Sequence, residues 1–154
     1  MIKFLECRVP PLVLVLLFAA MMWALNMVFP EARISIPGTE WLAVIIATLG
    51  VIIAVLGVAA FRKAETTVDP RDPDQTARIV STGIYRISRN PMYVGFFLFL
   101  LAWAIYLQQL TTIPMLALFV AYLTRFQIIP EEHFLRAKFG ADFTAYCSQT
   151  RRWL

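Results

Sequence analysis

A segment rich in aromatic, cationic and turn-forming residues precedes one of the apolar runs of the chain. It extends from Ser81 to Gly95 and contains the pair Asn90-Pro91. Asparagine caps free amides and proline suits the first helical turn, so a helix is predicted to begin there. The free N–H groups and positive dipole of that helix end would suit a carboxylate or a phosphate. Asn90 can therefore cap the helix, contact a ligand, or do both.

The same segment carries two arginines, Arg86 and Arg89, and a third, Arg125, lies near the end of the last apolar run. An arginine at a membrane surface can hold a substrate carboxylate or simply contact lipid headgroups. Within an apolar run it must face a polar cavity or extend to the interface. Both interpretations remain open for all three.

A second polar segment, residues 130–140, starts with proline and two acids and ends with glycine, which predicts a short amphipathic helix. Glu131 and Glu132 could complement a cationic ligand, although Glu132 could instead pair with Arg136 one turn away. His133 is the only histidine and could carry protons or serve the fold.

Several other chemistries lack a sequence signal. The chain has no GxGxxG, Walker or HExxH pattern, and no metal site is predicted. Cys7 and Cys147 lie at opposite ends of the chain, so both are interpreted as free thiols. The net charge of +4 comes from residues scattered between apolar runs, with no continuous basic stripe, which argues against nucleic acid as a partner.

The elements that must position these residues are membrane helices. The chain is 60% hydrophobic and 16% charged, with a mean hydropathy of +0.69. A helix needs roughly 20 apolar residues to cross the hydrocarbon core. We therefore predict an all-α integral membrane protein, a single domain of residues 1–154. Its four transmembrane helices are expected at residues 12–29, 41–61, 91–110 and 113–129.

The last two predicted spans are separated only by a short polar turn and should form a helical hairpin. In the second span Ala47, Gly50, Ala54 and Gly57 recur at helical spacing and predict a face for close helix packing. The aromatic tail within residues 130–154 is expected to form short helices lying at the bilayer surface.

Lys and Arg residues concentrate in the loop of residues 62–90 and in the tail. The positive-inside rule then places both termini, that loop and the tail in the cytoplasm, and a bacterial inner membrane is the expected location. Any chemistry in the two polar segments would face the cytoplasm and meet membrane lipids.

Together these segments resemble the isoprenylcysteine carboxyl methyltransferase family and the related phospholipid methyltransferases, which are integral membrane enzymes. The resemblance covers about the last two-thirds of the chain. Many members of the family have histidine where Asn90 stands. The motifs that carry the resemblance are Thr66–Pro70, Gly83–Gly95, Glu131–Leu135, Phe139-Gly140 and Tyr146–Trp153.

The resemblance implies S-adenosylmethionine as methyl donor, bound where the loop and tail meet. A sulfonium cation is stabilised by aromatic faces and carboxylates. By resemblance, the donor-binding residues would be Tyr85, Asn90, Pro91, Tyr93, Glu131, Glu132 and Arg151. Catalytic roles would fall to Arg86, Glu132 and Arg125.

The implied acceptor is a lipophilic small molecule or lipid-modified substrate with a carboxylate or thiol. A carboxylate or thiolate is an ionised nucleophile, so no strong base is needed. One alternative is a phospholipid amine N-methyltransferase, with Glu131, Glu132 or His133 as the base. Others are an enzyme similar to NADPH-dependent sterol reductases and a membrane scaffold without catalytic activity.

Overall fold

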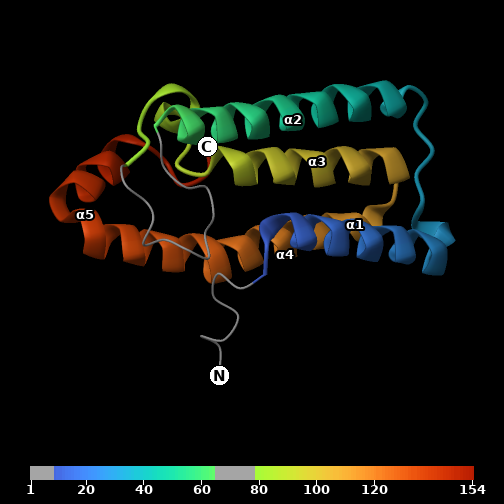
Figure 1. The fold of residues 1–154 in the computed structure, drawn as a ribbon. Helices are drawn as coiled ribbons and strands as arrows, with labels where there is room; N and C mark the ends of the chain where they lie inside the picture. Colours follow the sequence, from blue (N-terminus) through green and yellow to red (C-terminus); the bar gives the residue numbers. More distant parts are fainter. Residues whose placement is uncertain (1–8, 65–78) are drawn as a thin grey trace.

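The computed structural model describes residues 9–64 and 79–154. Helices are the regular structure of this part of the chain (Figure 1). The α-helices are α1 (Pro11–Val28), α2 (Thr39–Lys63), α3 (Pro91–Leu107), α4 (Ile113–Leu123) and α5 (Ile129–Gln149). Single 3-10 turns, η2 (Pro30–Ala32), η4 (Gly83–Arg86) and η5 (Leu110–Thr112), occupy the connections.

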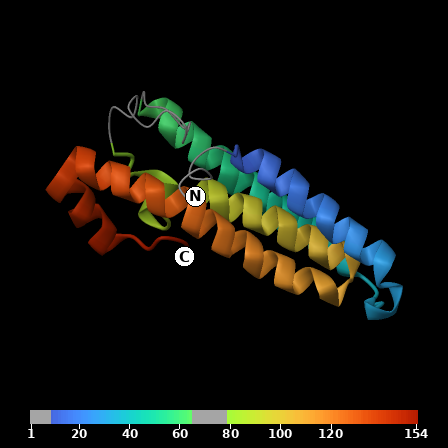
Figure 2. The ribbon, with the colours of Figure 1, turned by 90° about the horizontal axis from the view of Figure 1, so that it is seen from below.

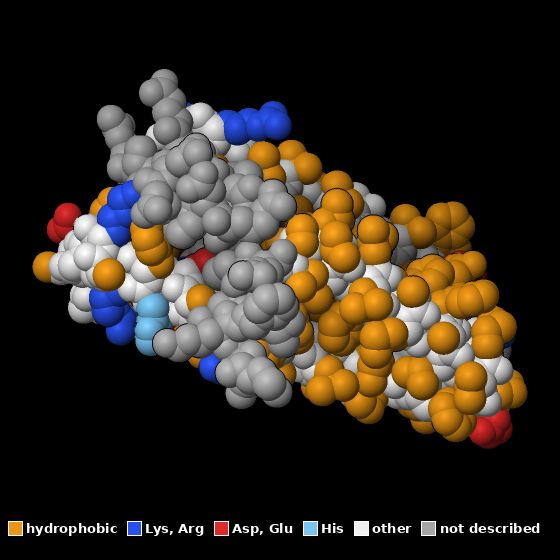
Figure 3. Space-filling view, turned by 60° about the horizontal axis from the view of Figure 1, so that its bottom comes forward, with side chains coloured by type: hydrophobic (Ala, Val, Ile, Leu, Met, Phe, Trp, Pro, Cys, Tyr) orange, Lys and Arg blue, Asp and Glu red, His pale blue; other side chains and the backbone are white. Residues whose placement is uncertain are grey.

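The outer surfaces of the helices are apolar. Leu16 is 63% exposed and Ile45 64%, and hydrophobic side chains dominate much of the face in Figure 3, with Lys and Arg gathered mainly at one end. Three helical segments are long and apolar enough to cross a bilayer: α1, α2 and the continuous run Leu110–Gln149. Contiguous exposed apolar area of this kind requires lipid as solvent. The chain is an integral membrane protein.

The third predicted span is shorter in the structure than expected. Helix α3 ends at Leu107 rather than at residue 110, because Gln108 adopts a left-handed conformation with φ 54°. Its 17 residues correspond to about 25 Å of helix. After the turn, α4 runs back antiparallel beside α3, which confirms the helical hairpin (Figures 1 and 2).

The predicted helix start near Pro130 is found, with Pro130, Glu131 and Glu132 in the first turn of α5, but this helix is not separated from the span before it. Helix α4 passes through a π-helical turn, η6 (Thr124–Ile128), directly into α5. Pro130 cannot donate a backbone hydrogen bond, and its ring crowds the preceding helical turn. The adjacent π turn is wider than an α-helical turn and accommodates both the missing hydrogen bond and the ring. The predicted stop at Gly140 is confirmed as a kink. Its φ of 54° and ψ of −118° turn the second half of α5 back toward the bundle (Figure 2).

Helices α2 and α3 make the most extensive contact in the bundle, and the predicted small-residue face of α2 lies in it. A Cβ atom on Gly95 would lie 2.6 Å from the carbonyl oxygen of Gly50 and 2.9 Å from the Cβ of Ala54. The remaining core joins α1, α3 and α4. Its members with no exposed surface include Met22, Leu100 and Phe119.

Candidate functional site

The segment before α3 and the C-terminal tail lie against one another at the polar end of the bundle. Ser88 and Arg151 form an isolated parallel bridge, in which the amide of Arg89 donates to the Arg151 carbonyl over 2.9 Å. The Asn90 side-chain amide donates to the carbonyl of Arg152, also over 2.9 Å. Two segments about sixty residues apart are thus joined, which agrees with the meeting of loop and tail that the family resemblance implied.

Asn90 occupies the N-cap position of α3, but its side chain makes no capping hydrogen bond. The expected side-chain cap is therefore wrong. The side chain instead binds the tail through Arg152, while the backbone amide of Asn90 donates to the hydroxyl of Ser88 over 3.1 Å. A structural bond of this kind also fixes the orientation of Asn90 at the entrance of the helix.

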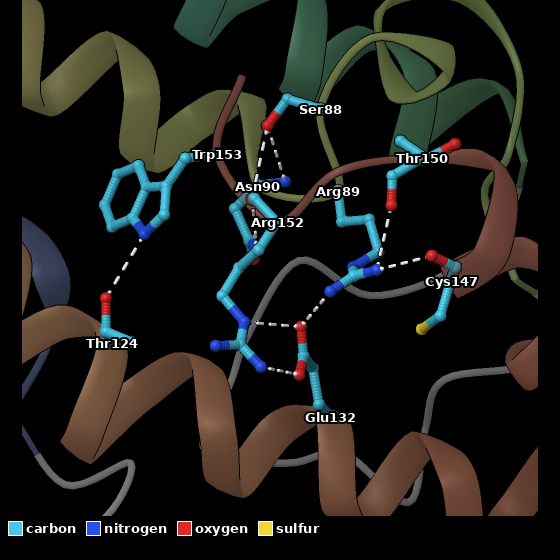
Figure 4. Close-up of polar contacts among 9 residues, drawn as sticks. All are labelled: Ser88, Arg89, Asn90, Thr124, Glu132, Cys147, Thr150, Arg152 and Trp153. Atoms are coloured by element: carbon cyan, nitrogen blue, oxygen red, sulfur yellow. Dashed lines mark hydrogen bonds and ion pairs between the residues drawn. The ribbon is translucent and has the colours of Figure 1, made fainter.

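A buried carboxylate holds two arginines at the centre of this junction (Figure 4). Glu132 Oε1 accepts from Arg89 Nη2 over 2.8 Å and from Arg152 Nε over 3.0 Å, and Oε2 accepts from Arg152 Nη2 over 2.7 Å. Burial opposes ionisation of Glu132, but the hydrogen bonds and charges of Arg152 and Arg89 outweigh it and lower the pKa of this carboxyl. The surface pair with Arg136 that sequence spacing allowed is replaced by this cluster.

The sequence did not predict the structural role of Arg89, which was expected to hold a substrate carboxylate or to contact lipid headgroups. Its Nη1 atom also donates to the carbonyls of Cys147 over 3.0 Å and Thr150 over 2.8 Å, at the C-terminal end of α5. Cations bind favourably to the free carbonyls of a helix end. Its position directly before Asn90-Pro91 was the available sequence signal. That signal could not reveal its partners, because they lie 58 and 61 residues away.

Glu131 lies in different surroundings from its neighbour. Its Oε1 atom accepts from the Tyr93 hydroxyl over 2.7 Å. Burial raises the pKa of Glu131 to about 7, the Tyr93 hydrogen bond opposes that shift, and the charge of Glu132 adds to it. Glu131 is therefore a carboxyl that can hold or release a proton near neutral pH.

Two tyrosines complete the junction. Tyr146 donates to the backbone carbonyl of Tyr85 over 2.7 Å, and the ring of Tyr85 contacts Phe61 edge-on at 5.2 Å. Tyr85 is 4% exposed, and its hydroxyl has no hydrogen-bond partner among the described residues. Burial is the main cause of a raised pKa for both tyrosines, so both phenols stay protonated.

These groups line one cavity with an empty volume of about 490 Å³, part of it open to the outside. Its polar wall includes Tyr85, Arg89, Asn90, Glu131 and Glu132. Its apolar wall is formed by Phe61, Ile79, Val80, Ile128, Leu135 and Phe143. A mostly apolar pocket with a few converging polar groups is the usual form of a ligand site.

Comparison with known proteins bears on what such a cavity serves. A family model described as phospholipid methyltransferase matches residues 39–142, which include α2, α3, α4 and most of α5. The chain belongs to the phospholipid methyltransferase family. It is thus one of the integral membrane methyltransferases, as the sequence motifs predicted. Membership in this family indicates methyl transfer to a lipid-like substrate.

Two relatives in rice, from Oryza sativa subsp. indica and subsp. japonica, are each named probable protein-S-isoprenylcysteine O-methyltransferase. Each is 27% identical over 132 residues, which cover 83% of this chain and 66% of the rice protein. The chain thus spans about two thirds of their length. An uncharacterized protein of Haemophilus influenzae is 36% identical over 63 residues, 41% of this chain and all of that protein. No solved structure matches the chain.

Within this family member, the residues predicted from sequence divide into two groups. Tyr85, Asn90, Glu131 and Glu132 line the cavity. Pro91 is buried at the start of α3, and Tyr93 reaches the cavity residue Glu131 through a hydrogen bond. Three others, Arg86, Arg125 and Arg151, are exposed and do not line it. Arg125 lies in the π turn, 5.4 Å from the centre of the Phe126 ring. In the tail, Arg152 rather than Arg151 reaches Glu132.

Two other predicted features have a simpler outcome. His133 is exposed on α5 and does not line the cavity. The Thr66–Pro70 motif and Cys7 lie outside the described residues. In the part of the chain that the structure describes, no cluster of His, Cys, Asp or Glu could hold a metal ion.

Proposed function

We propose that this protein transfers a methyl group from S-adenosylmethionine to a lipophilic acceptor in the cavity between the segment before α3 and helix α5. One observation carries the proposal. The two segments with methyltransferase-like motifs close around a cavity that contains a carboxyl with a pKa of about 7 and a buried tyrosine hydroxyl without a partner.

The cavity suits the charges of the donor. S-adenosylmethionine supplies a methyl group on a positively charged sulfur, which aromatic faces and a carboxylate would stabilise. Tyr85, Phe143 and Glu131 offer these groups in the cavity wall. The donor also carries a carboxylate, for which the unpaired Nε of Arg89 is a fitting partner. The hydroxyl of Tyr85 would find a partner in the same ligand.

The chain's own residues would act mainly by positioning. Methyl transfer is an in-line displacement, and its rate depends on holding the reacting atoms in close contact without intervening water. Glu132 fixes Arg89 and Arg152 and thereby ties the tail across the cavity. Glu132 and Arg152 are therefore proposed as positioning residues, and Glu131, Tyr85 and Arg89 as residues that contact ligand.

The acceptor class has two candidates. A carboxylate or thiolate acceptor corresponds to the name of the rice relatives and needs no base, because it is already ionised. An amine headgroup corresponds to the description of the family model and must first lose a proton. Glu131 favours the second candidate, because a carboxyl with a pKa of about 7 is suited to accept that proton near neutral pH.

The acceptor can be tested by incubating membranes containing the protein with methyl-labelled S-adenosylmethionine and separating the labelled lipids. We expect label in a lipid fraction. For an amine acceptor, the rate should rise with pH around 7, and Glu131→Gln should remove that dependence and lower the rate at least tenfold. For a carboxylate acceptor the rate should be flat over this range. Absence of label in every lipid and lipid-modified protein would contradict the proposal.

A further inference from the structure

A second cavity lies at the opposite end of the bundle from the candidate site. It has an empty volume of about 920 Å³, including its open mouth, and lies where α1 and α3 end and α2 begins. Three aromatic residues, Trp23, Trp103 and Tyr106, line it together with one cation, Arg33, and one anion, Glu40. None of these residues belongs to the site described above.

An apolar groove continues from this cavity along the outer surface of α2 and α3. Its empty volume is about 510 Å³, and Glu40, Trp103 and Tyr106 line both spaces. The rest of the groove is lined by Ala43, Val44, Ala47, Phe99 and Ala102. Small side chains on α2 create the groove, and an exposed apolar groove on a membrane helix pair faces lipid chains. The headgroup-sized space and the chain-sized space are therefore contiguous.

The walls of the cavity are fixed before any ligand enters. The Gln108 carbonyl accepts from the Ile34 amide over 2.8 Å, and its side-chain amide donates to the Ile36 carbonyl over 3.1 Å, which holds the connecting loop to the end of α3. Trp103 donates from Nε1 to the Ala19 carbonyl over 3.1 Å and stacks on Tyr106 at 5.5 Å. Such a preformed site loses little entropy on binding.

Arg33 and Glu40 are both exposed and do not pair with one another in the structure. Two opposite charges facing one aromatic cavity match a ligand that carries both signs. A phosphate would contact the guanidinium, and an ammonium would contact the carboxylate and the aromatic faces. The buried side-chain oxygen of Asn26, also in the cavity wall, has no hydrogen-bond partner and would accept from that ammonium.

We propose that this end of the protein binds a phospholipid with a zwitterionic, amine-bearing headgroup, its headgroup in the aromatic cavity and one acyl chain in the groove. This lipid site is separate from the methyl-transfer cavity and does not depend on the proposed activity. Its position in the opposite leaflet would let the protein sense or retain a lipid that the candidate site cannot reach.

The test is native mass spectrometry of the purified protein in micelles that contain equal amounts of dioleoyl phosphatidylethanolamine and dioleoyl phosphatidylglycerol. The wild-type protein should retain phosphatidylethanolamine roughly three- to tenfold better, since an ammonium is recognised by aromatic faces and a carboxylate. Glu40→Gln should abolish this preference, and Arg33→Gln should weaken retention of both lipids. Val44→Trp, which fills the groove, should also weaken both.

Two controls separate this site from the candidate active site. Glu31→Gln removes an exposed acid at the same end that lines neither space, and it should leave the preference unchanged. Glu131→Gln shows whether the lipid occupies the candidate site instead, because Glu131 lines only that cavity. Equal retention of the two lipids by the wild-type protein would overturn the proposal. So would a preference that survives Glu40→Gln but is lost with Glu131→Gln, because the lipid would then occupy the other cavity.

Discussion

Glu131 and Glu132 are neighbours in the sequence, yet their side chains have opposite electrostatic surroundings. One helical residue corresponds to a rotation of about 100°, which directs Glu132 to two guanidinium groups and Glu131 to a phenol and the cavity. The first keeps its charge and the second is close to half-protonated at neutral pH. Sequence alone identified the pair but could not divide the roles, because both arginine partners come from distant segments.

Substituting Glu132→Gln should destabilise the protein by about 2–4 kcal/mol at pH 7, because it leaves Arg89 without its buried counter-charge. Chemical unfolding in detergent measures the difference, with the exposed Glu31→Gln as control, for which we expect less than about 0.5 kcal/mol. The low pKa of Glu132 means that the difference between wild type and variant should shrink as the pH falls below about 4.5. An equal effect at pH 3 and pH 7 would contradict this assignment.

Glu131→Gln should have the opposite pH dependence. The pKa of Glu131 is raised in the fold to about 7 from an ordinary 4.5, so the fold favours the protonated form. Its contribution to stability is complete below pH 4.5 and is lost as the pH rises to about 7. Relative to Glu131→Gln, the wild-type protein should lose about 1–3 kcal/mol between these limits. Unfolding curves of both proteins at pH 4.5, 6 and 8 measure this, and parallel pH profiles would refute the raised pKa.

At the scale of elements, strong local signals predicted the apolar runs, the Asn90-Pro91 helix start, the hairpin and the Gly140 break. The continuation of α4 into α5 was missed, because Pro130 is equally compatible with a first helical turn and with a helix that tolerates it through a π turn. The choice between Arg151 and Arg152 was missed for a similar reason. Side chains alternate in an extended tail, and the register of the tail is set by Ser88 and Arg89 far away in the sequence.

The contact between α2 and α3 can be tested with two glycine variants. Gly95→Ala should destabilise the protein by about 1–3 kcal/mol, because the new methyl group would meet backbone of α2 that cannot move aside. Gly57→Ala is the comparison variant, since its methyl group would lie 2.7 Å from a side-chain carbon of Met92 and 3.5 Å from the nearest backbone atom. In detergent, the midpoint temperature of thermal unfolding should be well below that of Gly57→Ala for the Gly95→Ala variant. The reverse order would show that the two helices do not pack through Gly50 and Gly95.

At the scale of the whole molecule, the bundle has two distinct ends. One end joins the pre-α3 segment to the tail around the candidate donor cavity, and the other holds the aromatic cavity between Arg33 and Glu40. The sequence predicted the first end from its motifs. It did not predict the second, because the aromatic residues there are separated by about 80 positions and resemble ordinary residues of a membrane interface.

The central claim is that the joined segments form a site for S-adenosylmethionine. Isothermal calorimetry of the detergent-solubilised protein with S-adenosylmethionine and with its demethylated product tests it most directly. We expect both to bind, and Tyr85→Phe, which removes only the unpaired hydroxyl, should weaken binding about two- to tenfold. The sample must first show a cooperative thermal unfolding transition, which demonstrates that the protein is folded. If neither compound then binds at millimolar concentration, the cavity is not a donor site and the account is wrong.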